Sequence, residues 1–349
     1  MSPPNVFVHE FVTGGGWPPG ELPLELGSEA AAMLRALLAD FRAWGAVRTL
    51  TTLDQRLDNV MLPADRVVHV TPGQHGPAFA SLLDQSDAAL IIAPETDGIL
   101  ARLSALTEET GVPLLGSSSA AVAIASDKAA CYELFQQAGL PTPVTRRAAF
   151  SSALQAAEEV GYPLVVKPLD GVGCQGVCLV NEPAKLADAL TLLRCTTVHD
   201  EIIIQRFVAG VHASVSLLVA DGRALPLSLN EQEIETGCPF AYQGGVIPLS
   251  HSAAGQALTL AQAAVSLIPG LNGYVGVDLI LAQKEALLIE INPRLTTSYI
   301  GLRQVLDLNL AQAIWDACRQ GVLPAQARLT GRAVFSKHQL LHALTMEAT

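Results

Sequence analysis

Aromatic and charged residues are both scarce in this chain of 349 residues. Phe, Trp and Tyr make up 5% of it and Asp, Glu, Lys and Arg only 15%, whereas 50% is apolar. A chain this apolar is not intrinsically disordered, and its length allows two or three packed units. Because aromatic residues are few, the apolar surplus consists of Ala, Leu and Val. Composition alone therefore indicates a large α/β protein and says nothing about chemistry.

Basic residues are outnumbered: Lys and Arg total 21 against 33 Asp and Glu, which gives a formal net charge of −12. Binding to nucleic acid without sequence preference requires a cationic surface that displaces counterions. The only short basic cluster is Arg146-Arg147. We therefore expect no nucleic-acid partner.

Long hydrophobic runs are also missing. No stretch approaches the roughly 18 uninterrupted apolar residues that a membrane-spanning helix needs. Residues 1–11 contain neither a basic segment nor the apolar core of a cleavable signal. The sequence thus predicts a cytoplasmic protein with no membrane partner.

The six cysteines contain no CxxC pair, and only Cys174 and Cys178 lie close together in the sequence. Zinc sites and disulfide frameworks usually show paired or regularly spaced cysteines. In a chain of this size the spacing favours buried or incidental free thiols over a metal site or disulfides.

The first third of the chain alternates short β-branched runs with amphipathic helical stretches, among them a helix expected over 24–44. Such alternation predicts a parallel sheet covered by helices on both faces. We assign residues 1–116 to a doubly wound α/β domain. Runs of consecutive strands follow, which predict an α+β module with mainly antiparallel sheets. We divide this module into residues 117–200 and residues 201–349.

A glycine-rich segment, Gly171 to Gly176, literally matches the G-x-G-x-x-G pattern of dinucleotide sites. That site needs a helix directly after the glycines, but the β-forming run 177–180 follows instead. The glycines therefore join two strands, and a nicotinamide-dependent oxidoreductase is not favoured. Beside Lys167 in the preceding strand, such a loop can cover a phosphate, although a plain flexible hairpin is the alternative.

Three side chains with oxygen ligands fall in two late strands. Glu290 and Asn292 are two residues apart and share a face, and Asp278 lies in a neighbouring strand. Two carboxylates and one amide suit Mg²⁺, which completes its shell with phosphates and water. An exposed pair of carboxylates on a hairpin is the alternative.

Taken in chain order, these segments resemble the ATP-grasp superfamily, over about residues 117–300. The segments are Ser126-Asp127-Lys128, Val166-Lys167-Pro168 with its glycine loop, 204–210, and Asp278 with Glu290-Ile291-Asn292-Pro293-Arg294. The resemblance implies that 1–116 is a pre-ATP-grasp domain, 117–200 a lid subdomain, and 201–349 a subdomain with the magnesium site. It also implies an ATP-dependent carboxylate–amine ligase that works through an acyl phosphate and releases ADP.

The resemblance also implies roles for individual residues. ATP would contact Lys128, Lys167, the flap glycines Gly171, Gly173 and Gly176, the adenine-side residues Gln205, Phe207 and Val208, and His212. His212 stands where the family commonly has a carboxylate that binds the ribose. Asp278, Glu290 and Asn292 would hold one or two Mg²⁺ ions, for which Mn²⁺ can substitute. Arg294 and Lys167 would act in catalysis, Arg294 by stabilising the acyl phosphate.

Two N-terminal segments, 9–16 and 94–98, resemble tyramine/tyrosine–glutamate ligases of methanofuran and methylofuran biosynthesis. This resemblance implies that the γ-carboxyl group of glutamate is joined to the amine of tyramine or tyrosine. Candidate substrate contacts are Gly14, Gly15, Glu95, Asp97 and Gln243. Tight turns, helix-capping carboxylates and a plain loop are the structural alternatives at these positions.

Other functions stay open on the sequence alone. An ATP-grasp ligase could act on other amino acids or activate bicarbonate, and a non-catalytic nucleotide-binding regulator is a further alternative. The presence of all three candidate metal ligands argues against loss of catalysis. An Ala- and Leu-rich helix over 254–267 leaves room for a homodimer interface.

Overall fold

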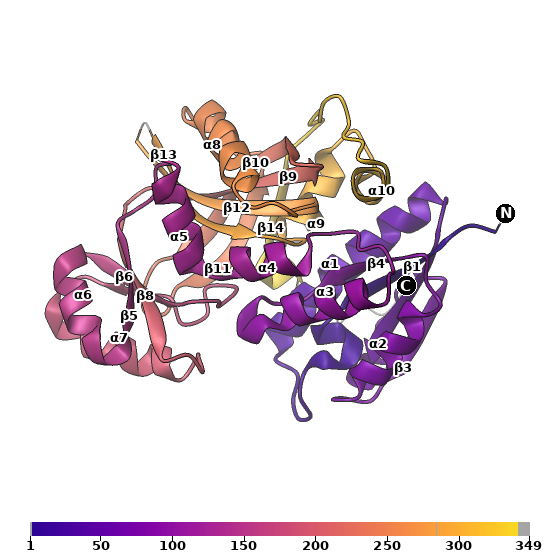
Figure 1. The fold of residues 1–349 in the computed structure, drawn as a ribbon, viewed down its shortest axis with the longest axis horizontal. Coiled ribbons are helices and arrows are strands. Elements are labelled where there is room, and N and C mark those ends of the chain that lie inside the picture. The colour runs from indigo at the N-terminus through magenta and orange to yellow at the C-terminus, as the bar shows by residue number, and fades with distance from the viewer. Residues whose placement is uncertain (1, 284, 341–349) are drawn as a thin grey trace.

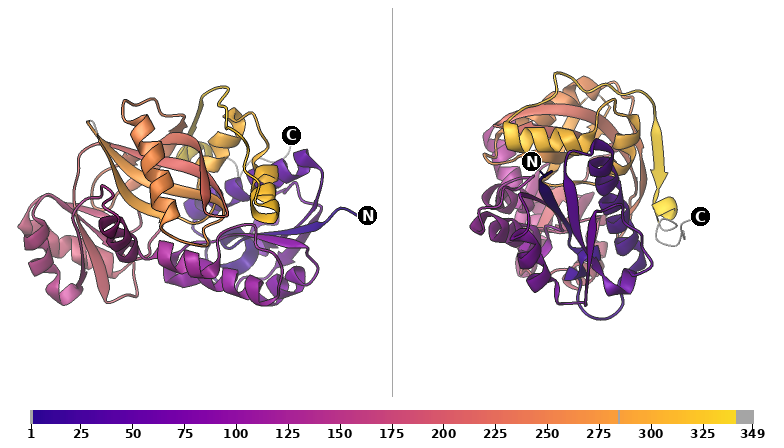
Figure 2. Two further views of the ribbon diagram at one scale, coloured as in Figure 1. Left: turned by 45° about the horizontal axis from the view of Figure 1, so that its top comes forward. Right: turned by 90° about the vertical axis from the view of Figure 1, so that its right-hand side faces the viewer.

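Three β-sheets organise the computed structural model, which describes residues 2–283 and 285–340. In Figure 1 the lid sheet and its helices lie on the left, the N-terminal domain on the right, and the largest sheet above and between them. The left view of Figure 2 shows the same three-part arrangement. Across the described ranges, no helix is both long and apolar enough to cross a bilayer.

The N-terminal domain contains a four-stranded sheet in the order β3-β2-β1-β4, and all neighbouring strands are parallel. Its elements are β1 (Asn5–Glu10), α1 (Leu24–Trp44), β2 (Arg48–Asp54), β3 (Arg66–Val70), α2 (His75–Leu83), β4 (Ala88–Ile92) and α3 (Ile99–Glu109). The predicted doubly wound parallel domain is thereby confirmed. Beyond β4, Leu114 adds one isolated parallel bridge to Ala89.

The carboxyl ends of these parallel strands carry two short turns. The π-helical turn η1 (Val12–Gly16) follows β1, and the 3-10 turn η3 (Thr96–Gly98) follows β4. Open α/β sheets present ligand-binding loops at this edge. The segment around η3 contacts the lid through Asp170 and the C-terminal part of the chain through Arg294.

The lid sheet has the order β5-β8-β6-β7 and is antiparallel throughout. It comprises β5 (Thr145–Ala149), α6 (Ala153–Val160), β6 (Leu164–Pro168), β7 (Cys178–Val180), α7 (Leu186–Arg194) and β8 (Glu201–Arg206). The glycine segment joins β6 to β7, as the sequence predicts. Because β8 pairs with β5 and β6, the predicted boundary at residue 200 falls too early.

The C-terminal sheet has the order β13-β12-β9-β10-β11-β14, with antiparallel neighbours. Its elements are β9 (Val211–Ala220), β10 (Arg223–Glu235), β11 (Ala241–Ile247), α8 (Ala254–Ser266), β12 (Gly273–Ala282), β13 (Glu285–Asn292), α9 (Ser298–Val305), α10 (Leu310–Gln320) and β14 (Ala333–Ser336). Helix α8 packs its small apolar residues against the inner strands of this sheet. The predicted α+β module is confirmed.

Two helical stretches are each interrupted by a capping residue. The stretch 119–138 divides into α4 (Ser119–Ser126) and α5 (Lys128–Gln137), because the carboxylate of Asp127 accepts hydrogen bonds from the first amides of α5. Asn309 likewise caps α10 and separates it from α9. The first interruption matters for the site, since it places Lys128 at the start of a helix.

One prediction about the cysteines is wrong: Cys178 and Cys238 form a disulfide, although 60 residues separate them. The residues meet because β7 lies beside the loop before β11, where the amide of Leu179 donates to the Gly237 carbonyl over 2.7 Å. The amide of Phe240 donates to the Val177 carbonyl over the same distance. The disulfide and these two hydrogen bonds therefore join the lid sheet to the C-terminal sheet.

Candidate active site

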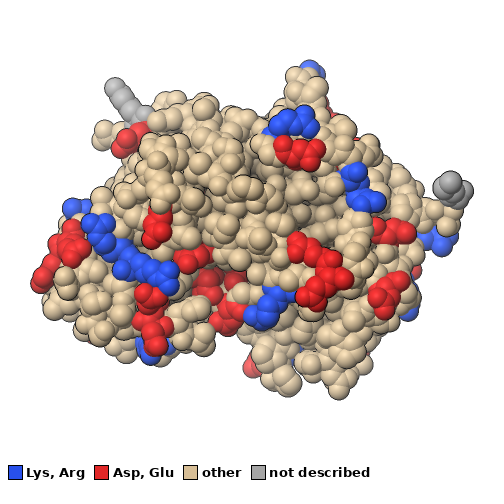
Figure 3. Space-filling model, viewed as in Figure 1, with Lys and Arg blue, Asp and Glu red and all other residues tan. Residues whose placement is uncertain are grey.

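An open cavity lies between the lid sheet and the C-terminal sheet. Its walls come from α5, β6, the glycine flap, the end of β8, and strands β9, β10, β12 and β13. The predicted residues that line it are Lys128, Lys167, Gly171, Gly173, Gln205, Phe207, Val208, His212, Asp278 and Glu290. In Figure 3, acidic side chains gather in the hollow between the lid and the N-terminal domain. The fold thus brings together most of the residues that the sequence singled out.

Lys167 projects from β6 and is only 5% exposed. Its Nζ donates to Oε1 of Gln205 over 3.0 Å, and Nε2 of Gln205 donates to Oγ1 of Thr145 over 2.8 Å. Burial lowers the pKa of Lys167 to about 8. The ammonium group therefore lies in a poorly solvated place where an added anion would stabilise its charge.

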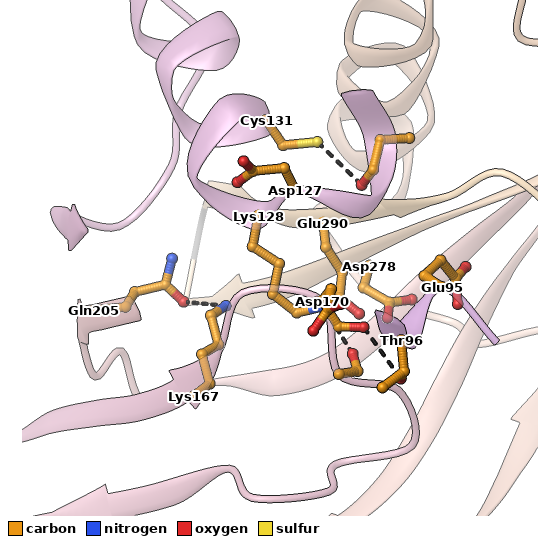
Figure 4. A network of polar contacts seen from close by, with 12 residues as sticks. Glu95, Thr96, Asp127, Lys128, Cys131, Lys167, Asp170, Gln205, Asp278 and Glu290 are labelled. Atoms are coloured by element: carbon orange, nitrogen blue, oxygen red, sulfur yellow. Dashed lines mark hydrogen bonds and ion pairs between the residues drawn. The ribbon is translucent and has the colours of Figure 1, made fainter. Parts of the chain in front are cut away.

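Lys128 connects three parts of the site (Figure 4). Its Nζ lies 3.1 Å from Oε2 of Glu290 on β13 and donates to the carbonyl of Gly171 at the flap over 2.8 Å. Burial alone would lower the pKa of Lys128, but the charge of Glu290 raises it overall. The lysine is thus held protonated between the candidate metal ligand and the glycine loop.

The candidate metal ligands converge through strand register. Asp278 on β12 pairs directly with Glu290 on β13, and Asn292 pairs with Gly276 two positions along. Burial, followed by repulsion from Glu290, raises the pKa of Asp278 to about 7. Burial disfavours the charge of Glu290, but Lys128 and other nearby cations outweigh it and lower its pKa.

This donor set fits a hard divalent cation. Carboxylate and amide oxygens are the ligands that Mg²⁺ takes in proteins, and a cation would relieve the repulsion between Asp278 and Glu290. Gln232, which sequence reasoning missed, is a fourth polar group at this site, and its Nε2 donates to Oδ1 of Asp278 over 3.2 Å. The residues present therefore fit a bound Mg²⁺.

His212 lies in β9 at the wall of the cavity, where its ring meets Phe240 edge to face at 6.1 Å. Burial lowers the pKa of His212, so the ring is neutral near pH 7. A neutral imidazole can bind a ribose hydroxyl by a hydrogen bond but cannot replace the charge of a carboxylate. Phe240 directly precedes β11 and also lines the cavity.

Arg294 lies just beyond the cavity, after the end of β13, and forms an ion pair with Glu95 of the N-terminal domain. Nε and Nη2 of Arg294 donate to Oε2 of Glu95 over 3.0 and 2.9 Å, and both side chains are largely buried. The other carboxylate oxygen, Oε1 of Glu95, is buried without a hydrogen-bond partner among the described residues. One candidate substrate residue and the candidate catalytic arginine are thus in direct contact.

The remaining candidates lie outside the cavity. Gly14 and Gly15 are buried in η1, where a Cβ on Gly14 would approach Oγ1 of Thr52 to 2.5 Å, so packing alone accounts for glycine there. Gly176 has a φ of +73° and sits against Thr196. Gln243 is exposed, and its Nε2 donates to Glu235 over 3.3 Å.

Asp97, the last candidate, is exposed and has a φ of 56°. Its amide donates to Oδ2 of Asp170, which directly precedes the flap glycines, over 2.8 Å. Asp170 is not among the candidate residues predicted from the sequence, although it lies between the strand that carries Lys167 and the glycine loop. Its partner Asp97 is 73 residues away, and no spacing pattern links the two.

A parallel N-terminal domain, an antiparallel lid with a glycine flap, and a C-terminal sheet bearing oxygen ligands define a nucleotide-binding protein. Residues 125–298 match the ATP-grasp domain family, and residues 47–122 match the pre-ATP-grasp 3 domain family. The chain therefore belongs to the ATP-grasp superfamily.

Sequence and structure comparisons agree with this assignment. The tyramine–L-glutamate ligase of Methanocaldococcus fervens is 34% identical over 220 residues, which cover 63% of this chain and 62% of that protein. A crystal structure described as an ATP-grasp superfamily protein from Archaeoglobus fulgidus is 27% identical with a TM-score of 0.69, covering 95% of this chain and 91% of that one. Biotin carboxylase from Campylobacter jejuni shares the fold, with a TM-score of 0.76 at 16% identity over 95% and 74% of the two chains.

Proposed function

We propose that the protein is an ATP-dependent carboxylate–amine ligase that forms an acyl phosphate and releases ADP and phosphate. The observation that carries the proposal is the convergence in one cavity of Lys128, Lys167, Asp278 and Glu290 beneath a glycine flap. Arg294 lies just beyond the ligand strand that carries Glu290. This arrangement provides cations for phosphate oxygens, oxygen ligands for a metal, and an arginine for the reacting acyl group.

The chain's own groups can perform each task that phosphoryl transfer to a carboxylate requires. Lys128 and Lys167 bind and orient the phosphate oxygens, and they stabilise the negative charge that shifts among these oxygens during the transfer. Asp278, Glu290 and Asn292 would hold Mg²⁺, which supplies further charge neutralisation when bound. The flap from Gly171 to Gly176 excludes water from the activated acyl group, which would otherwise hydrolyse.

For substrates we propose the γ-carboxyl group of glutamate and the amine of tyramine or tyrosine, within methanofuran or methylofuran biosynthesis. The tyramine–L-glutamate ligase similarity supports this choice, although the matched region spans only 62% of that relative. The buried pair of Arg294 and Glu95 adds a chemical argument. The guanidinium suits an acyl phosphate, and the unpartnered Oε1 of Glu95 can accept a hydrogen bond from an amine.

An assay of ADP release tests this function. The protein with Mg-ATP and glutamate should release ADP at a rate that rises with added tyramine or tyrosine, and the γ-glutamyl amide should be detectable by mass spectrometry. A panel of other amino acids and bicarbonate serves as the comparison. If bicarbonate, and no amine, stimulated ADP release, the amide-forming function would be refuted.

A further inference from the structure

The loop after β4 contacts two parts of the site that belong to different domains. Glu95 holds Arg294 through two hydrogen bonds to one carboxylate oxygen. The next two residues, Thr96 and Asp97, hold Asp170 at the base of the flap. Three consecutive residues of the N-terminal domain thus bind both the candidate catalytic arginine and the loop that covers the phosphates.

The contact with the flap base consists of two hydrogen bonds across the domain boundary. The amide of Asp97 donates to Oδ2 of Asp170 over 2.8 Å, and Oγ1 of Thr96 donates to the Asp170 carbonyl over 3.3 Å. The side chain of Asp170 is 13% exposed, so water competes little for its carboxylate. In Figure 4, Thr96 and Asp170 lie next to each other below Glu290, and Glu95 lies beside Asp278.

A third contact to Asp170 comes from within the lid. Nε2 of His199, in the loop before β8, lies 3.0 Å from the same Oδ2 oxygen. Gly171, which follows Asp170 in the chain, accepts a hydrogen bond from Lys128 through its carbonyl. The base of the flap is therefore tied on one side to the N-terminal loop and on the other to the candidate metal site.

We propose that Thr96, Asp97 and Asp170 form a latch that fixes the closed flap relative to Arg294. The latch residues touch no reacting atom and act as positioning residues, and the proposal rests on the ligase function proposed above. Because adjacent Cα atoms are about 3.8 Å apart, the short segment from Glu95 to Asp97 leaves little freedom between arginine and flap. Shielding of the acyl phosphate and orientation of Arg294 then occur together.

The latch predicts how much ATP is hydrolysed without forming an amide. When the flap opens too early, water can attack the acyl carbon, release phosphate and return the free carboxylate, so that the net reaction is ATP hydrolysis. Wild-type protein should form about one amide per phosphate released. Asp170→Ala should raise the ratio of phosphate to amide at least about threefold. Thr96→Val should raise this ratio less than Asp170→Ala does. Thr96→Ser, which keeps the hydroxyl group, should show the wild-type ratio.

The matched control is His199→Ala. It removes the contact within the lid to the same carboxylate oxygen but leaves both bonds to the N-terminal loop, so its phosphate-to-amide ratio should stay near one. An unchanged ratio in Asp170→Ala would overturn the latch, and so would equal leakage in both variants. If Asp170→Ala lowers the unfolding temperature, the phosphate-to-amide ratio of Thr96→Val becomes the deciding measurement, because this substitution removes only a hydroxyl group.

Hydrogen exchange separates failure of the latch from failure of the ligase function. A non-hydrolysable ATP analogue with Mg²⁺ should protect the amides of residues 169–180 in wild type and in His199→Ala, but much less in Asp170→Ala. This readout needs neither glutamate nor an amine. Equal protection in all three proteins would overturn the latch whatever the substrates are, whereas lack of amine-dependent ADP release in wild type would overturn only the ligase function.

Discussion

Glu290→Gln should lower the rate of ATP consumption on the order of 10²- to 10³-fold. The substitution keeps the size of the side chain but removes the charge that faces Lys128 at 3.1 Å and Asp278 across the strand pair. A neutral amide binds Mg²⁺ more weakly and leaves the ammonium of Lys128 without its ion-pair partner. Steady-state rates over a range of Mg²⁺ concentrations would measure the loss, and added Mg²⁺ should restore only part of it.

The control for this variant lies on the same strand. Glu285 begins β13 but is exposed, so Glu285→Gln makes the same chemical change away from the cavity. It should leave the rate and the Mg²⁺ dependence as in wild type. If Glu290→Gln behaved in the same way as Glu285→Gln, the magnesium site would be misplaced.

Lys167→Met should weaken ATP binding about 10- to 100-fold, because a hydrogen bond to a charged group contributes roughly 1.5–3 kcal/mol. Lys185→Met, which changes an exposed lysine in the same subdomain, is the control. Titration calorimetry with a non-hydrolysable ATP analogue measures both. Equal affinities in the two variants would show that Lys167 does not bind the phosphates.

The pKa of Lys167 adds a pH dependence with a defined sign. With a pKa of about 8 in the free protein, the side chain loses its proton as the pH rises through 8. Above that pH, ATP must bind together with a proton, so wild-type affinity should fall by up to about tenfold per pH unit. Lys167→Met has no proton to take up and should lose this dependence.

The candidate metal site could be predicted from the sequence because it follows from strand periodicity. Glu290 and Asn292 share a face by their spacing alone, and Asp278 lies in the strand that precedes theirs in the chain. A hairpin-like pairing of two consecutive strands is the simplest arrangement, and the structure has it. The sequence likewise predicts that the glycine loop joins two strands, since β-forming residues rather than a helix follow Gly176, and β7 confirms it.

Contacts between distant segments could not be predicted in this way. The disulfide between Cys178 and Cys238 and the bonds from Thr96 and Asp97 to Asp170 join segments that lie 60 to 74 residues apart. They depend on how the lid packs against the other two parts, and no periodic pattern encodes that packing. The boundary at residue 200 failed for the same reason, because β8 completes the lid sheet by pairing with strands from earlier in the chain.

In the proposed reaction a carboxylate is activated as an acyl phosphate beneath the flap. Glutamate labelled with ¹⁸O in its γ-carboxyl group, incubated with the protein, Mg-ATP and the amine, tests it most directly. One labelled oxygen should appear in the released phosphate for each amide formed, because the carboxylate oxygen attacks the γ-phosphorus. Amide formation with unlabelled phosphate, or with label in AMP, would contradict it.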